Sequence, residues 1–362
     1  MRFLDRDEHP MRFAVITSVT SGLTATVILG VVGAITRTGL LTSSVPLWSL
    51  IVTVVAILCL AVVLVGRGRT TTRRAFLVVH AFTETHWVSE LTHNTHRALD
   101  RRGTEMVLKI PDKDFSEAGQ THHLRNILSH RDQYVGGLIV SVEPGQTRHD
   151  LVRFCASFLK PVVMMDVQPF KDERDYPPNT SFVGYDATVI GTRAADWVVA
   201  QLMAMGETEP IVLVVGGPRQ RGRQERFVEV VKEKVPKARV ILDDDGEFVR
   251  MRARKVVGRC LQGLRDEGRQ PAIIFCTSDE MALGAVDALL AEGTTTTAVV
   301  GVDGTPEAKA LIDTGQSPLR ATVVQDPYRV SEIAVDLLER MLRGERVPVH
   351  TLLAGEICTA ST

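Results

Sequence analysis

Residues 273–327 read IIFCTSDEMALGAVDALLAEGTTTTAVVGVDGTPEAKALIDTGQSPLRATVVQDP, and this stretch decides the fold that we predict. Short apolar runs alternate with longer amphipathic segments, which predicts the order strand, helix, strand, helix, strand. A polar residue stands at the end of each predicted strand, namely Ser278, Asp303 and Gln325. Because ligands of open α/β sheets bind beyond the carboxyl ends of the strands, the stretch predicts one side of a ligand site.

The same alternation runs from Ala75 through most of the remaining chain. Nearly continuous apolar strands separated by amphipathic helices are typical of parallel sheets with helices on both faces. Residues 75–362 are too many for one sheet of this kind. We therefore predict an α/β domain with two similar lobes, each built on its own sheet.

The composition excludes several functional classes. The 362 residues carry a net charge of −1, which gives no overall attraction to nucleic acid, and no helix-turn-helix pattern precedes Ala75. The five cysteines include no C-x-x-C pair, and the histidines, eight of which lie between His80 and His149, are interpreted as solvated helix faces. No nucleophile, zinc-protease or phosphate-loop motif is present. We predict a protein that is not an enzyme, with no catalytic residue, no metal or cofactor and no nucleic-acid partner.

Two uncharged windows lie near the N-terminus. No charged residue separates Arg12 from Arg37, and none follows until Arg67. Each window is long enough to cross a hydrocarbon core of about 30 Å as a helix. We predict an N-terminal segment over 1–12, transmembrane helices over 13–36 and 46–66, and a polar linker over 67–74. A cleaved signal peptide is the disfavoured alternative, because the first window is long and a second one follows closely.

Arginines flank the two predicted spans unevenly. Only Arg37 lies between the spans, whereas seven arginines lie outside them: Arg2, Arg6, Arg12, Arg67, Arg69, Arg73 and Arg74. Since basic residues are enriched on the cytoplasmic side, the bias predicts that both chain ends face the cytoplasm from the cell (inner) membrane. A domain on the outer side is the alternative.

The first predicted span carries a stripe of small residues at a four-residue spacing, made of Ser18, Gly22, Thr26, Gly30 and Ala34. Such stripes let helices approach closely in lipid. The stripe predicts packing either against the second span of the same chain or against a second copy in a homodimer.

Four segments resemble a known family: TSDEMALGAVDAL, VVGVDGTPEAKALIDTG, ATVVQDPY and VGGPRQRGRQERFVEVV. They are similar, in the same order, to segments of the type I periplasmic sugar-binding proteins and the lac-repressor-like effector domains. The resemblance covers about residues 75–358. It implies two Rossmann-like lobes that are joined by three crossing strands and close on a ligand by hinge bending. Lobe 1 would comprise about 75–183 plus 327–353, and lobe 2 about 184–326 plus 354–362.

The resemblance also implies a set of ligand-binding residues: Glu84, His86, Trp87, Asp166, Arg223, Phe248, Ser278, Asp303 and Gln325. Glu84, His86 and Ser278 differ from the residues that are common in the family, and Val167 replaces an arginine that often follows the aspartate. Carboxylates, an arginine and aromatic faces are also what a small polyol needs. On position alone, Asp303 is also a candidate cap for the helix after it, and Asp279 is expected to cap its own helix.

These features favour a membrane-anchored sensor that closes around a sugar or related polar metabolite and signals to a partner. The first alternative is the solute-binding component of an ABC-type sugar uptake system, with its domain outside. The second is an enzyme or sensor for a phosphorylated sugar or nucleotide. It rests on a cluster of arginines near a predicted helix start, made of Arg219, Arg221, Arg223 and Arg226.

Overall fold

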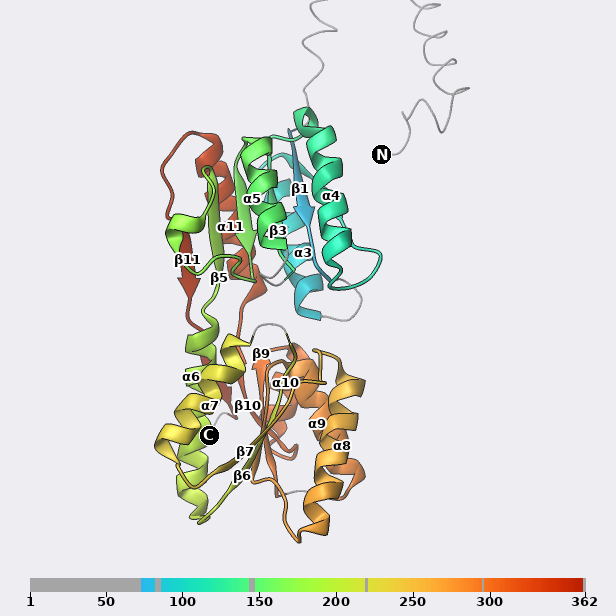
Figure 1. Ribbon diagram of the computed structural model, residues 1–362, viewed down its shortest axis with the longest axis vertical. Coiled ribbons are helices and arrows are strands. Elements are labelled where there is room, and N and C mark those ends of the chain that lie inside the picture. The colour runs from blue at the N-terminus through green and yellow to red at the C-terminus, as the bar shows by residue number, and fades with distance from the viewer. Residues whose placement is uncertain (1–72, 82–85, 143–146, 219–220, 295, 361–362) are drawn as a thin grey trace, which may run out of the picture. The chain divides into compact units, whose positions relative to one another are not determined.

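The computed structural model describes residues 73–81, 86–142, 147–218, 221–294, 296–360 (Figure 1). These residues form two α/β lobes, each built on a six-stranded sheet, so the predicted two-lobe α/β fold is confirmed. The predicted membrane helices, their small-residue stripe and the segment before them lie outside the described residues. Among the helices that are described, none is both long enough and apolar enough to cross a membrane.

The lobe 1 sheet has the order β11-β5-β4-β3-β1-β2, and all of its strand pairs are parallel. Its strands are β1 (Arg73–Val78), β2 (Thr104–Lys109), β3 (Gly136–Val140), β4 (Val162–Met165), β5 (Thr180–Tyr185) and β11 (His350–Leu353). The helical segments of this lobe are α3 (His86–Asp100), α4 (Glu117–Ser129), η2 (Arg131–Gln133), α5 (Thr147–Phe158), η3 (Glu173–Asp175) and α11 (Pro327–Leu342). Residues of α3 and α11 share one buried cluster with the sheet, and residues of α4 and α5 share the other.

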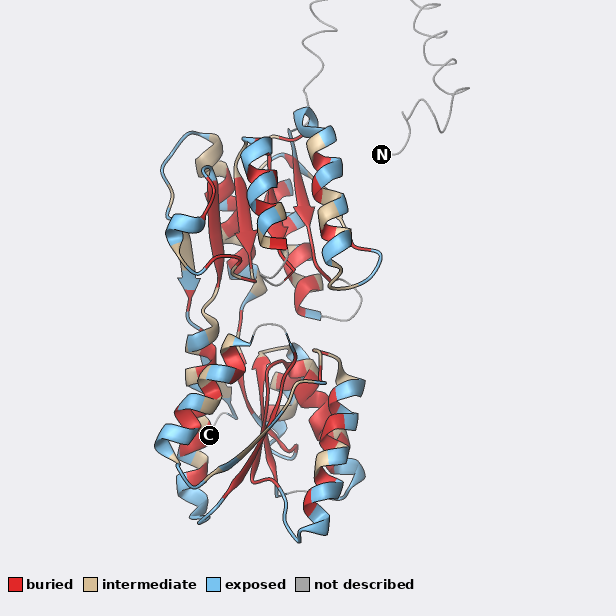
Figure 2. Cartoon of the chain, in the orientation of Figure 1, coloured by how far each residue is buried: buried red, intermediate tan, exposed pale blue. Residues whose placement is uncertain are grey.

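The lobe 2 sheet has the order β12-β10-β9-β8-β6-β7. Its strands are β6 (Ile211–Val215), β7 (Arg239–Asp243), β8 (Ile273–Cys276), β9 (Ala298–Asp303), β10 (Leu319–Val324) and β12 (Glu356–Thr359). Its helices are α6 (Ala187–Met205), α7 (Gly222–Lys234), α8 (Arg250–Asp266), α9 (Asp279–Ala291) and α10 (Pro306–Thr314). Helices α6 and α7 cover one face, and α8, α9 and α10 cover the other, which leaves the inner strands β6, β8, β9 and β10 largely buried between them (Figure 2).

The chain passes between the lobes three times: after β5, after β10 and between β11 and β12. At the first two passages, the Tyr185 hydroxyl accepts a hydrogen bond of 2.8 Å from the backbone N–H of Asp326. At the third, a Cβ on Gly355 would lie only 2.8 Å from Val323 Cγ1, a close approach that favours glycine. The chain enters lobe 2 at the carboxyl end of β10, so β12 pairs antiparallel with that strand, which departs from the expectation of purely parallel sheets.

The start of β1 also differs from the sequence prediction, which extended the linker to residue 74. Arg73 and Arg74 pair in parallel register with Thr104 and Glu105, so the first strand begins two residues earlier. Both arginines make ion pairs within lobe 1, Arg73 with Glu339 at 3.1 Å and Arg74 with Glu105 at 2.8 Å. The two residues therefore belong to the α/β domain.

Candidate functional site

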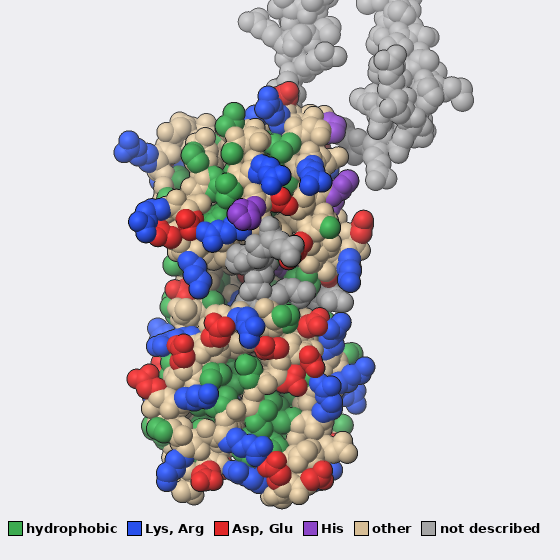
Figure 3. Space-filling view, viewed as in Figure 1, with side chains coloured by type: hydrophobic (Ala, Val, Ile, Leu, Met, Phe, Trp, Pro, Cys, Tyr) green, Lys and Arg blue, Asp and Glu red, His purple; other side chains and the backbone are tan. Residues whose placement is uncertain are grey.

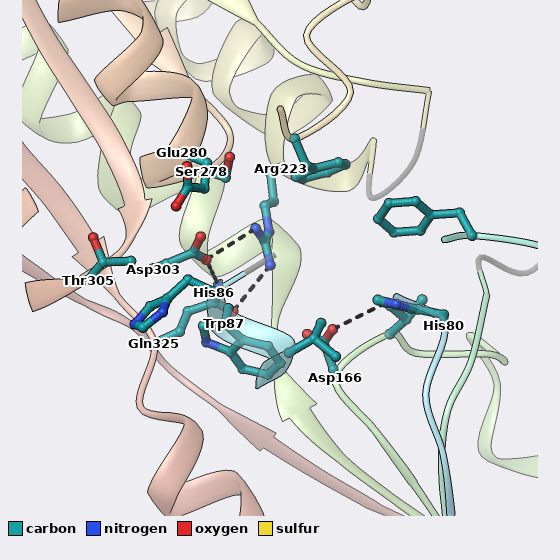
Figure 4. Close-up of a pocket in the computed structure, with 14 residues that line it drawn as sticks. His80, His86, Trp87, Asp166, Arg223, Ser278, Glu280, Asp303, Thr305 and Gln325 are labelled. Atoms are coloured by element: carbon teal, nitrogen blue, oxygen red, sulfur yellow. Dashed lines mark hydrogen bonds and ion pairs between the residues drawn. The ribbon is translucent and has the colours of Figure 1, made fainter. Parts of the chain in front are cut away.

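A pocket lies at the carboxyl ends of strands from both sheets. Its empty space, including the part open to solvent, is about 660 Å³. Its lining residues are His80, His86, Trp87, Val88, Phe115, Asp166, Val167, Arg223, Phe248, Ser278, Glu280, Asp303, Thr305 and Gln325 (Figure 4). We call the lobe 1 residues of this set the first wall and the residues from Arg223 to Gln325 the second wall.

The structure brings together eight of the nine residues predicted from the resemblance: His86, Trp87, Asp166, Arg223, Phe248, Ser278, Asp303 and Gln325. The ninth, Glu84, lies outside the described residues. The shared location follows from topology, because the carboxyl ends of parallel strands meet at one edge of each sheet. That the eight side chains contact a ligand stays a prediction.

Arg223, Gln325 and Asp303 form a hydrogen-bonded network on the second wall (Figure 4). Arg223 is 5% exposed and donates from Nη1 to the carbonyl of Thr277 at 3.0 Å and from Nη2 to Gln325 Oε1 at 3.2 Å. Gln325 Nε2 in turn donates to Asp303 Oδ1 at 2.7 Å. Arg223 Nη1 lies 3.9 Å from the same Asp303 oxygen. The network thus ties the start of α7 to the ends of three strands.

Asp279 supports the second wall from behind. It is fully buried and accepts hydrogen bonds from Thr322 Oγ1 and from the backbone N–H of Thr305, both at 2.7 Å. The expectation that Asp279 caps α9 is wrong, because the cap is Ser278, whose hydroxyl accepts from the N–H of Met281 at 3.3 Å. Asp279 instead holds the turn that follows Asp303.

Asp303 is not a helix cap either. The cap of α10 is Thr305, whose hydroxyl accepts from the N–H of Ala308 at 3.3 Å. The carboxylate of Asp303 is therefore left to line the cleft, where its Oδ1 is held by Gln325. Its Oδ2 receives no hydrogen bond from the described part of the chain.

Burial dominates the electrostatics of the two cleft aspartates. It raises the pKa of Asp303 to about 8, although the nearby Arg223 opposes the shift. Burial also raises the pKa of Asp166 to about 6, again against the influence of Arg223. Asp166 Oδ2 lies 3.8 Å from His80 Nε2. Buried carboxylates without a full set of donors are suited to accept hydrogen bonds from a ligand.

The backbone is strained at four cleft residues. Seven described residues other than glycine have a positive φ, and four of them line the pocket: Phe115 at 60°, Asp166 at 65°, Phe248 at 64° and Asp303 at 118°. Such conformations cost on the order of 1–3 kcal/mol each and cluster at functional sites. The clustering is independent of the hydrogen bonds and identifies the same cleft.

Sequence reasoning missed four polar or aromatic lining residues: His80, Phe115, Glu280 and Thr305. His80 and Glu280 follow predicted strands, so their positions after strand ends could have identified them as site residues. The interpretation of the histidines as solvated is wrong for His80, which is 4% exposed. Phe115 carried no such signal, because it belongs to the segment after β2 and meets Phe248 of lobe 2 at a ring-centroid distance of 6.5 Å.

The predicted arginine cluster does not assemble in the cleft. Arg221 and Arg226 pair with surface carboxylates, Arg221 with Asp244 at 3.4 Å and Arg226 with Glu229 at 3.2 Å. Among the described arginines, only Arg223 lines the pocket, and Arg219 lies outside the described residues. On the face shown in Figure 3, side chains of both charge signs are interspersed. The cluster therefore gives no support to a phosphorylated ligand.

Two lobes around a polar cleft, joined by three chain crossings, define a hinged binding protein. The family model for a periplasmic binding protein domain matches residues 76–346, and the chain belongs to this family. The chain is thus a binding protein rather than an enzyme, as expected from the sequence.

Curated relatives are similar in sequence to part of this chain. The ribose import binding protein of Escherichia coli strain K12 is 28% identical over 187 residues, which are 52% of this chain and 59% of that protein. The D-allose-binding periplasmic protein of the same organism is 29% identical over 166 residues, or 44% of this chain and 49% of that protein. The aligned segments thus span only about half of each relative.

Solved structures share the fold. An ABC transporter solute-binding protein from Bacillus halodurans C-125, solved with bound myo-inositol, has a TM-score of 0.69 and 19% sequence identity. The match covers 80% of this chain and 94% of that one. At this identity the similarity shows the two-lobe fold alone.

Proposed function

We propose that this chain is the sugar-binding component of an ABC-type importer and that its α/β domain lies outside the cytoplasm. One observation carries the proposal: the network of Arg223, Gln325 and Asp303 faces Asp166 and Trp87 of the other lobe across one cleft. Carboxylates and a guanidinium bind hydroxyl groups, and aromatic faces pack against the C–H side of a sugar ring. The names of the relatives, which include import and periplasmic proteins for ribose and allose, support the same function.

Hinge closure would be driven by the ligand. A ligand shifts the equilibrium between open and closed forms only by its preference for the closed one. A sugar that contacts Asp166 of lobe 1 and Asp303 of lobe 2 together has such a preference, because only the closed cleft presents both. A permease would then recognise the closed form.

A binding experiment with a matched control tests the cleft. The full-length protein is melted with and without D-ribose, D-allose and myo-inositol, and we expect at least one of these to raise the melting temperature in a dose-dependent manner. Asp303→Ala should abolish this shift, whereas Asp313→Ala should keep it, because Asp313 is exposed on the neighbouring α10. Equal shifts in both variants would remove Asp303 from the site.

A cytoplasmic sensor is the second candidate, and the arginine bias around the predicted spans favours it. That bias is smaller than the sequence count, because Arg73 and Arg74 are strand residues with partners in lobe 1. A reporter that is active only outside the cytoplasm, fused after Thr362, separates the two candidates. Activity supports the importer component, and an inactive but expressed fusion would contradict it.

A further inference from the structure

The cleft has an unbalanced charge inventory. Three carboxylates line it, those of Asp166, Glu280 and Asp303, and Arg223 is the one guanidinium or ammonium group among the described lining residues. The residue after Asp166 is Val167, which is 7% exposed, lines the same cleft and adds no charge. The remaining titratable lining groups are the imidazoles of His80 and His86. Buried charge without compensation is unfavourable, and the described part of the site offers its carboxylates few cationic partners.

Arg223 makes no hydrogen bond to any of the three carboxylates, because its two terminal nitrogens donate to other groups and its Nε is buried without a partner among the described residues. Nη1 donates to the Thr277 carbonyl and Nη2 to Gln325, and the closest approach to a cleft carboxylate is the 3.9 Å distance to Asp303. These partners are neutral acceptors. The guanidinium therefore orients the second wall and leaves most of the carboxylate surface to the ligand.

The carboxylates themselves lack donors. The side chain of Asp166 is 7% exposed, and neither of its oxygens receives a hydrogen bond from the described residues. The side chain of Asp303 is 12% exposed and receives one, from Gln325. Glu280 lines the cleft without a side-chain hydrogen bond within the described chain. The three carboxylates thus face one cavity, and Gln325 is the single described side chain that donates a hydrogen bond to any of them.

The surroundings do not restore the balance. Arg250, a cation that acts on Glu280, is already paired with Asp287 at 2.8 Å and with Glu307 at 2.9 Å. An opening next to the cleft shares His86, Trp87 and Asp303 with it and adds Lys309, but it also adds Glu90 and Asp326. Behind the second wall, Asp279 contributes a further buried carboxylate. Trp87 and Phe248 supply aromatic faces, which attract cations as well as the C–H side of a sugar.

We propose that the ligand of this cleft is a polyol that carries an ammonium group, such as an amino sugar or an aminocyclitol. The ammonium group binds between the Asp166 and Asp303 carboxylates, and the hydroxyl groups take the remaining acceptors. The inference rests on the proposed sugar-binding function and narrows it to a cationic class.

The empty cleft relieves its excess charge by holding a proton, since the pKa of Asp303 is raised to about 8 by burial. The charged groups that act on Asp303 are Arg223, Asp279 and Asp166. A bound ammonium favours the ionised carboxylate, so it displaces this proton into solvent. Binding should therefore release a proton below pH 8 and strengthen with rising pH until the amine itself loses its charge.

The first test compares ligands that differ only in charge. Titration calorimetry of the full-length protein uses D-glucose, D-glucosamine and N-acetyl-D-glucosamine, and the same three forms of galactose and mannose, together with D-ribose, D-allose and myo-inositol. We expect an amine to bind at least about tenfold more tightly than its neutral parent and its N-acetyl form, with proton release shown by two buffers of different ionisation enthalpy. Equal or tighter binding of the neutral sugars would overturn the inference and leave the proposed function standing. If no compound binds, the sugar-binding function itself fails, and the inference fails with it.

The second test places a cation in the protein. Val167→Lys adds an ammonium group beside Asp166, and Val167→Met is the matched control without charge. The lysine variant should lose the preference for the amine by about tenfold or more, whereas the methionine variant should keep it. An unchanged preference in a lysine variant that melts like the wild type would contradict the proposed position of the ligand's charge.

Discussion

The two walls of the cleft are built differently. On the second wall, hydrogen bonds connect Arg223, Gln325 and Asp303, and Asp279 holds the turn behind them. On the first wall, Asp166 has no side-chain hydrogen bond and Trp87 Nε1 is buried without an acceptor, as far as the described residues show. The difference indicates that internal hydrogen bonds organise the second wall more than the first wall, although Arg223 Nε and Asp303 Oδ2 also lack a partner among the described residues.

The largest expected effect comes from breaking the second wall at its centre. Arg223→Ala should weaken binding of the neutral sugar that binds best by about 3 kcal/mol, or about a hundredfold, because Gln325 loses its donor and the link from α7 to the strand ends is lost. Titration calorimetry measures the loss. Arg221→Ala is the control, since Arg221 is about half exposed and pairs at the surface. Similar affinities in both variants would contradict the central role of Arg223.

A smaller effect, on the stability of the protein rather than on binding, should distinguish the second wall from the first. Asp279→Ala removes the acceptor of two hydrogen bonds at buried or partly buried positions and should lower the free energy of unfolding by about 2 kcal/mol. Asp166→Asn removes no such bond and relieves a buried carboxylate, so it should not destabilise the empty protein. Urea unfolding measures both. If Asp166→Asn destabilises as much as Asp279→Ala, the two walls do not differ as described.

The smallest effect, counted per pH unit, is the dependence of stability on pH. Asp303 has a folded pKa of about 8, above the value of an unfolded aspartate, so the folded state binds more protons between about pH 4 and pH 8. The stability of the empty protein should fall as pH rises through this range, by at most about 1.4 kcal/mol per pH unit from this group.

Thermal melts from pH 5 to pH 8 follow this dependence. Asp303→Asn should flatten the upper part of the profile, from about pH 6 to pH 8, where Asp166 and Asp279 contribute less because burial raises their pKa only to about 6. Asp313→Asn should leave the profile unchanged. A wild-type profile that rises with pH in this range would have the opposite sign and would refute the assignment.

The parts that could be predicted from sequence follow from periodicity. Apolar runs fixed the strands, and parallel topology then required Ser278, Asp303 and Gln325 to share one edge. The helix caps were harder to predict from sequence. Ser278 and Asp279 are adjacent, and only the backbone conformation decides which of them caps α9.

Other features depend on tertiary packing. The segment that carries Phe115 returns to the cleft, where its N–H bonds the carbonyl of His80 at 2.6 Å, and its positive φ has no sequence signal in a phenylalanine. Strand β12 is antiparallel because the last crossing enters lobe 2 at the carboxyl end of β10, which local propensity does not encode. Sequence reasoning therefore found the strand ends of the site but missed residues supplied by the connecting segments.

The three chain crossings also have a consequence for synthesis. Lobe 1 takes α11 and β11 from the C-terminal part of the chain, after the main part of lobe 2, and lobe 2 takes β12 from still later. Helix α11 packs with α3 in one buried cluster, so lobe 1 cannot complete its hydrophobic core until residues near 340 have left the ribosome. The growing chain therefore stays incompletely folded until almost all of it has been made.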